Sequence, residues 1–393
     1  MEYSKVNISH FTCFLGIYFF ALILGSMNIG SFGSLLKIIG LIPVVICFIQ
    51  KRGRIRISGI TLAISLFVFI VALSYLWSID KSSTLTRIVT QFSFLLLAVS
   101  TDSFDYSNDE IKYLKRMLVW SSRITVIFTL LFSNYFHGRI YLNGIFREDP
   151  NYLCAYFMFG VVYGIENLLS KQSFLYKFIA IIEMFVYAYT ILSTGSRGGA
   201  LAVLASMLIS FYLIQRAKRT TLMKLIFQVL FIVIICVLLY FATTFIAPYI
   251  LKRFSFNNIA LSEGTGRYRI WSDALRTYRD SNLFNQIFGY GSGSAITIAR
   301  EFNFYYVNVF HNAFIENLLE IGILGLFSYC AYIFISWNSA RISRNVFAIS
   351  VISGMIALSL SVSIGAFKPY WNIILFIIVL KNSTIMKENK QLR

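Results

Sequence analysis

The feature that most constrains this 393-residue chain is a series of long apolar stretches separated by short polar segments. About 20 apolar residues in a helix, rising about 1.5 Å each, cross the roughly 30 Å hydrocarbon core of a bilayer. Hydrophobic residues make up 58% of the chain and charged residues only 13%, against about 25% in soluble domains. The sequence therefore predicts an all-α integral membrane protein.

Hydropathy predicts about 12 transmembrane helices in a single polytopic domain, 1–393. The predicted spans are 11–30, 33–50, 58–77, 84–100, 117–134, 151–169, 177–194, 199–215, 225–248, 312–336, 346–366 and 369–380. The first span follows a polar start without a small-residue cleavage site, which predicts a retained helix and not a removed signal peptide.

The long segment at roughly 250–310 differs from the other connections and is predicted to form an extracytoplasmic cap loop containing short amphipathic helices. Its helical periodicity is carried by Trp271, Ala274, Leu275 and Tyr278. This pattern predicts a helix lying on the membrane face. The cap residues that could stack on sugar rings are Tyr268, Trp271, Tyr305 and Tyr306. The glycine-rich 288–293 stretch is predicted to be a flexible turn, because no strand precedes it as a dinucleotide site requires.

Basic residues alternate between the connecting segments and predict the orientation of the chain. They cluster after the second, fourth and eighth spans, as Lys51, Arg52, Arg54, Arg56, Lys112, Lys115, Arg116, Arg216, Lys218, Arg219 and Lys224. These clusters predict the cytoplasmic side, with both termini cytoplasmic and the polar clusters outside. The net charge of +18 is therefore explained by topology, and no nucleic-acid partner is predicted.

Two charged residues lie deep inside predicted spans. Arg123, near the basic cytoplasmic end of its span, is predicted to snorkel towards the membrane surface. Glu183 precedes Arg197 by about 21 Å of helix, which is too deep for the same pocket. The five cysteines lie in apolar stretches without metal-ligand spacing, so no metal site is predicted.

Three short motifs on the outer side could carry chemistry. The first, residues 193–199, sets Ser196 and Arg197 among three glycines at the start of a helix, where backbone amides and a guanidinium can bind a phosphate. A tight turn with a snorkelling arginine is the alternative. The second places Arg267 and Arg269 at the head of the cap helix; two residues apart, they cannot share a helix face, and lipid-headgroup binding is the alternative.

The third motif begins at His311 and enters the tenth span. Asn312, Glu316 and Glu320 recur every four residues and share one helix face. Acids are costly in a bilayer, so this stripe is expected to face a wet cavity or partners. Histidine is the residue type best suited to abstract a proton near neutral pH, so His311 could act as a base, although a histidine at a helix start is more often structural.

The three motifs together resemble the O-antigen ligase and O-antigen polymerase superfamily. The resemblance rests on residues 194–199, on Arg267 four positions before Trp271, and on His311-Asn312 followed by Gly322-x-x-Gly325. It covers about the second half of the chain, from the 147–151 stretch onward.

The resemblance implies a glycosyltransferase that moves a glycan from undecaprenyl pyrophosphate to an acceptor hydroxyl, at the outer face of the bacterial cytoplasmic (inner) membrane, without metal or other cofactor. It implies that Arg197 and Arg267 bind the pyrophosphate and that His311 is the acceptor base. The predicted substrate-binding residues are Ser196, Arg269, Trp271, Asn312, Glu316, Arg147, Asp149 and Asn151.

The resemblance leaves the product open. The Asp149-Pro150-Asn151 stretch is similar to capsule, exopolysaccharide and O-antigen polymerases, which join lipid-linked repeat units with a flippase and a chain-length regulator as pathway partners. The pattern that starts at His311 is similar to ligases, which transfer the polymer to lipid A core. A third alternative, a flippase or transporter, is disfavoured because it would place charges near the midplane and show related halves.

Overall fold

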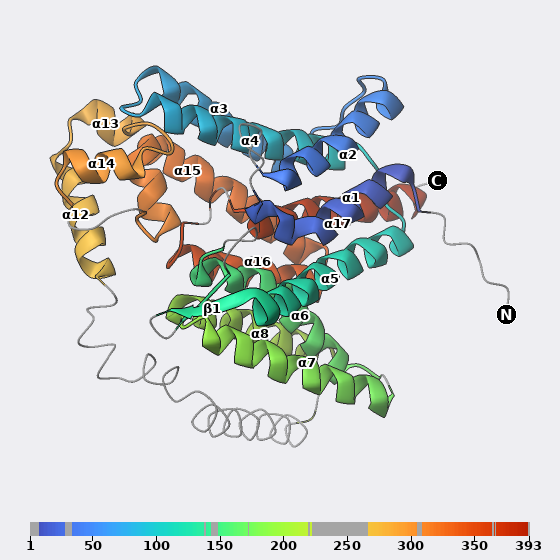
Figure 1. Cartoon of the computed structure of the whole chain (residues 1–393). Helices are drawn as coiled ribbons and strands as arrows, with labels where there is room; N and C mark the ends of the chain where they lie inside the picture. Colours follow the sequence, from blue (N-terminus) through green and yellow to red (C-terminus); the bar gives the residue numbers. More distant parts are fainter. Residues whose placement is uncertain are drawn as a thin grey trace. The chain divides into compact units, whose positions relative to one another are not determined.

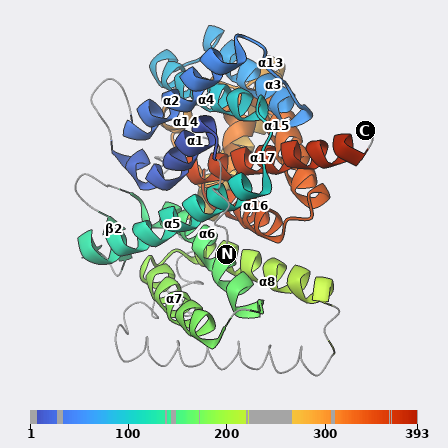
Figure 2. The same ribbon diagram turned by 90° about the vertical axis from the view of Figure 1, so that its right-hand side faces the viewer.

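The computed structural model describes residues 8–27, 34–136, 139–142, 148–171, 173–218, 221, 266–304, 309–363, 365 and 367–391. The chain, predicted as a single domain, divides into two compact units (Figures 1 and 2). Unit 1 comprises Met1–Leu118, Gly266–Asn345 and Ser359–Arg393, and unit 2 comprises Val119–Thr265 and Val346–Leu358.

The predicted all-α membrane class is confirmed, and the protein is a multi-pass membrane protein. Among the described residues, six helical segments are long and apolar enough to cross a membrane: Gly59–Leu76, Lys81–Asp102, Pro150–Leu169, Phe174–Ser193, Arg197–Lys218 and Ala313–Ile342. Two shorter apolar segments are His10–Ser26 and Val346–Ser359. The predicted span 225–248 lies outside the described residues.

Unit 1 is a helical bundle. Its helices are α1 (His10–Phe20), the 3-10 helix η1 (Ala21–Ser26), α2 (Leu35–Lys51), α3 (Gly59–Leu73) with the 3-10 turn η3 (Ser74–Leu76), α4 (Lys81–Asp102), the start of α5 (Asn108–Phe132), α15 (Ala313–Ile342) and α17 (Lys368–Gln391). Helix α3 packs against α4 and α15, and α17 packs against α4 and α15. Buried rings fill these contacts, as where Phe94 stacks on Trp371 with centroids 4.9 Å apart.

Three short helices form the described part of the cap: α12 (Arg267–Asp280), α13 (Leu283–Phe288) and α14 (Ala295–Glu301). They gather beside α15 in Figure 1 and contact it. A small core joins α12 and α14 to α15, formed by Ile270, Ala274, Tyr290, Ala295, Ile298, Phe310 and Leu319. The predicted cap helix is confirmed, but Leu275 lies on its outer face and is 48% exposed. Residues 250–265, Tyr305 and Tyr306 lie outside the described residues.

Unit 2 contains the remainder of α5 with α6 (Pro150–Leu169), α7 (Phe174–Ser193), α8 (Arg197–Lys218) and α16 (Val346–Ser359). Helix α6 packs against both α7 and α8, as Figure 2 shows. Two glycines permit close approach: a Cβ on Gly160 would collide with Tyr187, and one on Gly199 would collide with Cys154. Small residues at such contacts are typical of helix packing inside membranes.

A β-hairpin in unit 2 occupies the end of the predicted span 117–134 and part of the connection to the span 151–169. Strand β1 (Ser133–Phe136) pairs antiparallel with β2 (Arg139–Leu142), and Glu148 bridges back to Leu142. Two four-residue strands are too short to be recognised by alternation, so the hydropathy pattern could not reveal them. The hairpin brings Arg139 to the start of α6 and the end of α7.

Arg123, which was predicted to snorkel, pairs through its guanidinium with Glu183 on α7. Arg123 Nη2 lies 2.8 Å from Glu183 Oε1, and about a quarter of each side chain is exposed. The guanidinium carbon also lies 4.8 Å from the centroid of the Trp120 ring. A charge inside the bilayer is costly, so a carboxylate within reach on the neighbouring helix is the more favourable partner.

Candidate functional site

Asn312 is the N-cap residue of α15. Asn312 Oδ1 accepts hydrogen bonds from the backbone N–H groups of Phe314 (2.9 Å) and Ile315 (3.1 Å), as residues at this helix position commonly do. Its side-chain amide donates to the carbonyl of Leu360 at 3.3 Å. Asn312, predicted as a substrate ligand, therefore holds the helix start in place, and its contact with substrate remains a prediction.

His311 immediately precedes this cap in a left-handed backbone conformation, with φ of 53°. This conformation costs an L-residue about 1–2 kcal/mol, so the surrounding structure must hold it. The indole of Trp271 on α12 contributes, donating to the carbonyl of Phe310 at 2.9 Å. Trp271 thus positions the segment that carries His311, a role that its place in the sequence did not indicate.

Helix α15 breaks after its first eight residues. Ile321 and Gly322 leave helical geometry, and Gly322 has φ of 67°. The break frees carbonyl groups, and the glycine loop 289–294 binds them: Tyr290 N–H donates to Leu319 O at 3.0 Å and Gly291 N–H to Glu320 O at 2.7 Å. The predicted glycine turn therefore binds to the break in α15. This contact orients the segment Ala313–Glu320, called here the α15 arm.

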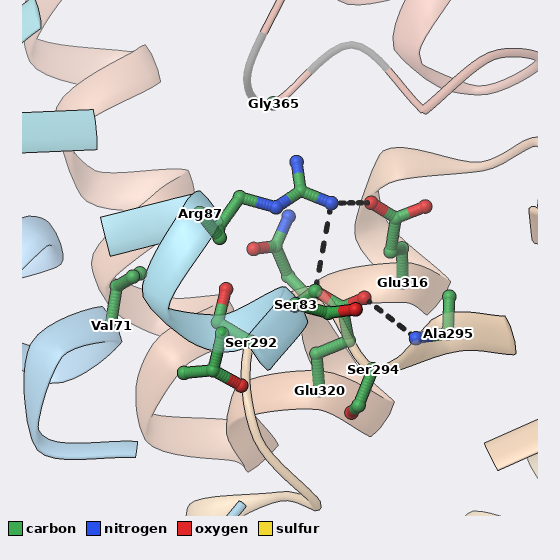
Figure 3. A network of polar contacts seen from close by, with 12 residues as sticks. Val71, Ser83, Arg87, Ser292, Ser294, Ala295, Glu316, Glu320 and Gly365 are labelled. Atoms are coloured by element: carbon green, nitrogen blue, oxygen red, sulfur yellow. Dashed lines mark hydrogen bonds and ion pairs between the residues drawn. The ribbon is translucent and has the colours of Figure 1, made fainter. Parts of the chain in front are cut away.

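Both acids of the predicted stripe lie on this arm and share Arg87 of α4 (Figure 3). Arg87 Nη2 lies 3.1 Å from Glu316 Oε1 and 4.0 Å from Glu320 Oε2. Glu316 is 5% exposed and Glu320 is 2% exposed. These acids were expected to face a wet cavity or partners, and Arg87 is such a partner, from a helix that the sequence analysis did not connect with them.

The two carboxylates differ in how they are satisfied. Glu320 accepts hydrogen bonds from the backbone N–H groups of Gly293 (2.7 Å) and Ala295 (3.1 Å), so it fastens the glycine loop to α15. Glu316 receives Arg87 on one oxygen, while its Oε2 is buried without a hydrogen-bond partner in the described part of the chain. A buried acceptor without a donor costs about 1–3 kcal/mol. Glu316 therefore keeps one carboxylate oxygen unsatisfied among the described residues.

The connection between α3 and α4 supports the same loop from the other side. Ile79 N–H donates to Tyr290 O at 3.0 Å, and Ser74 Oγ accepts from Ser292 N–H at 3.1 Å. Asp80 caps α4 through Ser83 N–H and also accepts the hydroxyl of Thr297 on α14 at 2.8 Å. The backbone hydrogen bond from Ser83 lowers the pKa of Asp80, the opposing effect of burial being smaller.

The residues at the head of α12 occupy different environments. Arg267 is the first residue of the helix and is half-buried, whereas Arg269 is exposed. An open hollow along the helix is lined by Tyr268, Trp271, Ser272, Leu275, Arg276 and Arg279. Aromatic rings beside guanidinium groups suit a glycan that carries or follows a phosphate. Of the residues that line this hollow, the helical periodicity of the sequence indicated only Trp271 and Leu275.

In unit 2, the turn between α7 and α8 has the expected anion-site outline. Gly195 has φ of 58°, and Ser196 Oγ accepts from Gly199 N–H at 3.1 Å, which caps the start of α8. Arg197 is the first residue of α8 and is half-buried. Cap and guanidinium thus lie at the positive end of the helix dipole.

Arg139, which the sequence analysis did not single out, fixes this turn. Its Nε donates to Thr194 O and its Nη2 to Asn151 Oδ1, both at 2.9 Å. Asp149 caps α6 and accepts two hydrogen bonds from Asn151 at 2.7 Å each. Asp149 and Asn151 therefore have structural partners, and their predicted contacts with substrate remain predictions. Arg147 lies outside the described residues.

The three predicted catalytic residues are distributed over both units: Arg197 belongs to unit 2, and Arg267 and His311 belong to unit 1. The suggestion that Arg197 and one cap arginine share a pocket remains a prediction. Within the described ranges, no group of three or more His, Cys, Asp or Glu side chains could hold a metal ion.

Comparison with known proteins identifies one family. Residues 182–330 match a family model described as O-antigen ligase, which confirms the resemblance to the O-antigen ligase and polymerase superfamily over this segment. The matched segment includes Arg197, Arg267, His311 and both acids of the α15 arm. It supports a ligase- or polymerase-like glycosyltransferase activity and is equally compatible with either. A search of the curated proteins found no match.

Proposed function

We propose that this protein polymerises undecaprenyl-pyrophosphate-linked oligosaccharide repeat units at the outer face of a bacterial cytoplasmic membrane, with both termini in the cytoplasm. The observation that carries the proposal is the arm of α15, inside the segment that matches the O-antigen ligase family. There His311 precedes a capped helix start, and Glu316 presents a buried oxygen that has no donor among the described residues. The arm can therefore receive a sugar hydroxyl next to a base.

The proposed reaction is one displacement. His311 takes the proton of the acceptor hydroxyl, the hydroxyl oxygen bonds to the anomeric carbon of the donor, and the bond from that carbon to the pyrophosphate oxygen breaks. Charge grows on the departing pyrophosphate, and the guanidinium groups of Arg197 and Arg267 are assigned to it on the resemblance. A fixed positive group favours this transition state over the ground state because the charge develops only as the bond breaks.

A second candidate is an O-antigen ligase that transfers the finished polymer to lipid A core, which is the activity that the matching family is described by. The two candidates share donor and chemistry and differ in the acceptor. Repeat units and lipid A core, offered separately to the purified protein, distinguish them. Elongated carrier-linked chains support polymerase, and label on lipid A core supports ligase.

The test uses the full chain in proteoliposomes with lipid-linked repeat units and EDTA, and product length is read by gel electrophoresis. His311→Ala, Arg197→Ala and Arg267→Ala are expected to lower the rate at least about 100-fold, as loss of a general base or of a transition-state donor does. Matched controls are His10→Ala, at the exposed start of α1, and Arg216→Ala, at the far end of α8. Elongation at wild-type rate by the three site variants would contradict the assignment.

A further inference from the structure

Helix α3 carries a stripe of exposed apolar side chains that continues into η3. The stripe consists of Leu62, Leu66, Phe69, Leu73 and Leu76, which are between 38% and 70% exposed. These positions alternate between steps of four and three residues, so they share one face of the helix. The segment Gly59–Leu76 is long and apolar enough to cross a membrane, and an exposed apolar face on such a segment contacts lipid.

Helix α13 of the cap lies against the end of this stripe. Trp77 directly follows Leu76, and the centroid of its ring lies 5.6 Å from the ring centroids of both Phe284 and Phe288. Its Nε1 also donates to the carbonyl of Phe288 at 3.3 Å. The helix is therefore held beside the end of the membrane span, where Figure 1 shows it.

The outer side of α13 is apolar and uncovered. Leu283 is 71% exposed and Phe284 is 47% exposed, and none of the six residues of α13 is buried. The helix has no charged residue, and the side chain of Gln286 donates within the cap, to the carbonyls of Arg279 and Ser281. Exposed apolar surface that continues a lipid-contacting face is typical of a membrane contact.

The residues around the end of the span indicate the depth at which α13 lies. Tyr75 is partly exposed, and Lys81 at the start of α4 places its Nζ 5.6 Å from the centroid of the Tyr75 ring. Tryptophan and tyrosine concentrate at the membrane–water interface, and a lysine there extends its ammonium group towards the headgroups. Because Trp77 belongs to this group and contacts α13, the helix lies at interfacial depth.

We propose that α13 anchors the cap in the lipid bilayer, with Leu283 and Phe284 inserted among the acyl chains next to the headgroups. On the proposed topology this is the outer leaflet, because the basic cluster 51–56 before α3 marks the cytoplasmic side. Helix α13 leads directly into the glycine loop, which binds the break in α15. The anchor therefore sets the depth of the α15 arm in the membrane.

The test is a lipid cross-link that does not depend on the glycosyltransferase proposal. The photoreactive amino acid p-benzoylphenylalanine replaces Leu283 in the full chain, which is reconstituted in proteoliposomes containing fluorescent phosphatidylethanolamine. Illumination is expected to give a fluorescent protein band. The same replacement of Leu76, in the stripe on α3, is the positive control, and that of Glu301, exposed and charged at the end of α14, is expected to give no lipid adduct.

A phosphatidylethanolamine with a diazirine on its acyl chain adds a measurement on the unaltered protein. Its cross-links are expected in peptides covering 62–76 and 282–288 and not in a peptide covering 300–303. Absence of the lipid adduct at position 283, an adduct of equal yield at position 301, or diazirine cross-links confined to other peptides would overturn the anchor. A cross-linked dimer in place of the lipid adduct at position 283 would overturn the assignment to lipid, because a second copy would then cover this face.

Discussion

Arg87 and Glu316 are 229 residues apart in the sequence, yet a hydrogen bond of 3.1 Å joins the guanidinium of one to the carboxylate of the other. This contact connects α4 to the short arm of α15, and Glu320 extends it to the glycine loop. One cation therefore holds together the helix start that His311 precedes and the loop that supports it. The arrangement makes Arg87 a positioning residue for the proposed site.

Replacing Arg87 by methionine is expected to lower the free energy of unfolding by about 3 kcal/mol, because Glu316 and Glu320 would stay buried without a counter-charge. The thermal midpoint of the purified protein measures this. Lys112→Met is the control, since its pair with Asp109 is largely exposed and is worth about 1 kcal/mol or less. Equal losses in the two variants would show that burial of the Arg87 pair has no special effect.

Gly322→Ala is expected to destabilise unit 1, because a Cβ there would collide with the carbonyl of Ile287 and the residue has φ of 67°. Strain of this kind costs about 1–3 kcal/mol, and the collision adds to it. Gly59→Ala is the matched control: nothing lies near its Cβ position, so the alanine should be neutral or slightly stabilising. The midpoints of thermal unfolding of the two variants are compared. An unchanged midpoint for Gly322→Ala would contradict the tight packing of the glycine loop against the break in α15.

Acid is expected to weaken the contact between α4 and α14 through Asp80. The pKa of Asp80 is lowered from its ordinary value of 3.8, mainly by the Ser83 backbone N–H and further by the Thr297 hydroxyl. A carboxyl with a lowered folded-state pKa contributes stability that is present above its unfolded pKa and lost as the pH falls through the folded pKa. The midpoint temperature of thermal unfolding should therefore decrease when the pH is lowered below about 4.

Asp80→Asn isolates this contribution, because the amide does not titrate in this range. Its oxygen can still accept from Ser83 N–H, and its NH2 group, in place of Oδ2, can donate to the Thr297 hydroxyl. The variant is expected to lose less stability than the wild type between pH 5 and pH 3, roughly the interval around the ordinary carboxyl pKa. Identical pH profiles for the two proteins would remove Asp80 from the explanation.

The Arg123–Glu183 pair is expected to behave as a unit. Arg123→Met or Glu183→Gln alone should lower stability by about 3 kcal/mol, because each leaves one charge without its partner inside the helical bundle. The double variant should recover most of this loss, since both charges are then removed together. A double-variant cycle on thermal midpoints measures the coupling, and additive losses would mean that the two residues act separately.

The proposed site could be predicted only in pieces. The motif residues Arg197, Arg267 and His311 were visible because glycines, paired basic residues and a histidine at a helix start are local patterns. Arg87 and Arg139 were not, because each lies in a stretch without a distinguishing pattern and acts on partners far along the chain. Their roles depend on which helix end or hairpin reaches which turn, and spacing within one segment carries no such information.

The sequence alone determined that this protein resides in a membrane and that it is built from successive apolar helices. Apolar runs of bilayer length can satisfy their backbone hydrogen bonds in a membrane only as helices. It also determined which helix face of 312–320 is acidic, because helical periodicity is a local property. Only the tertiary structure decided that α15 breaks at Gly322 and that the glycine loop binds the freed carbonyls. It also decided that Arg87 meets the buried Glu316 and that Arg123 meets the half-buried Glu183. The physical reason is that these contacts depend on the packing of distant segments, where the cost of burying a charge or a carbonyl selects a partner that no local pattern specifies.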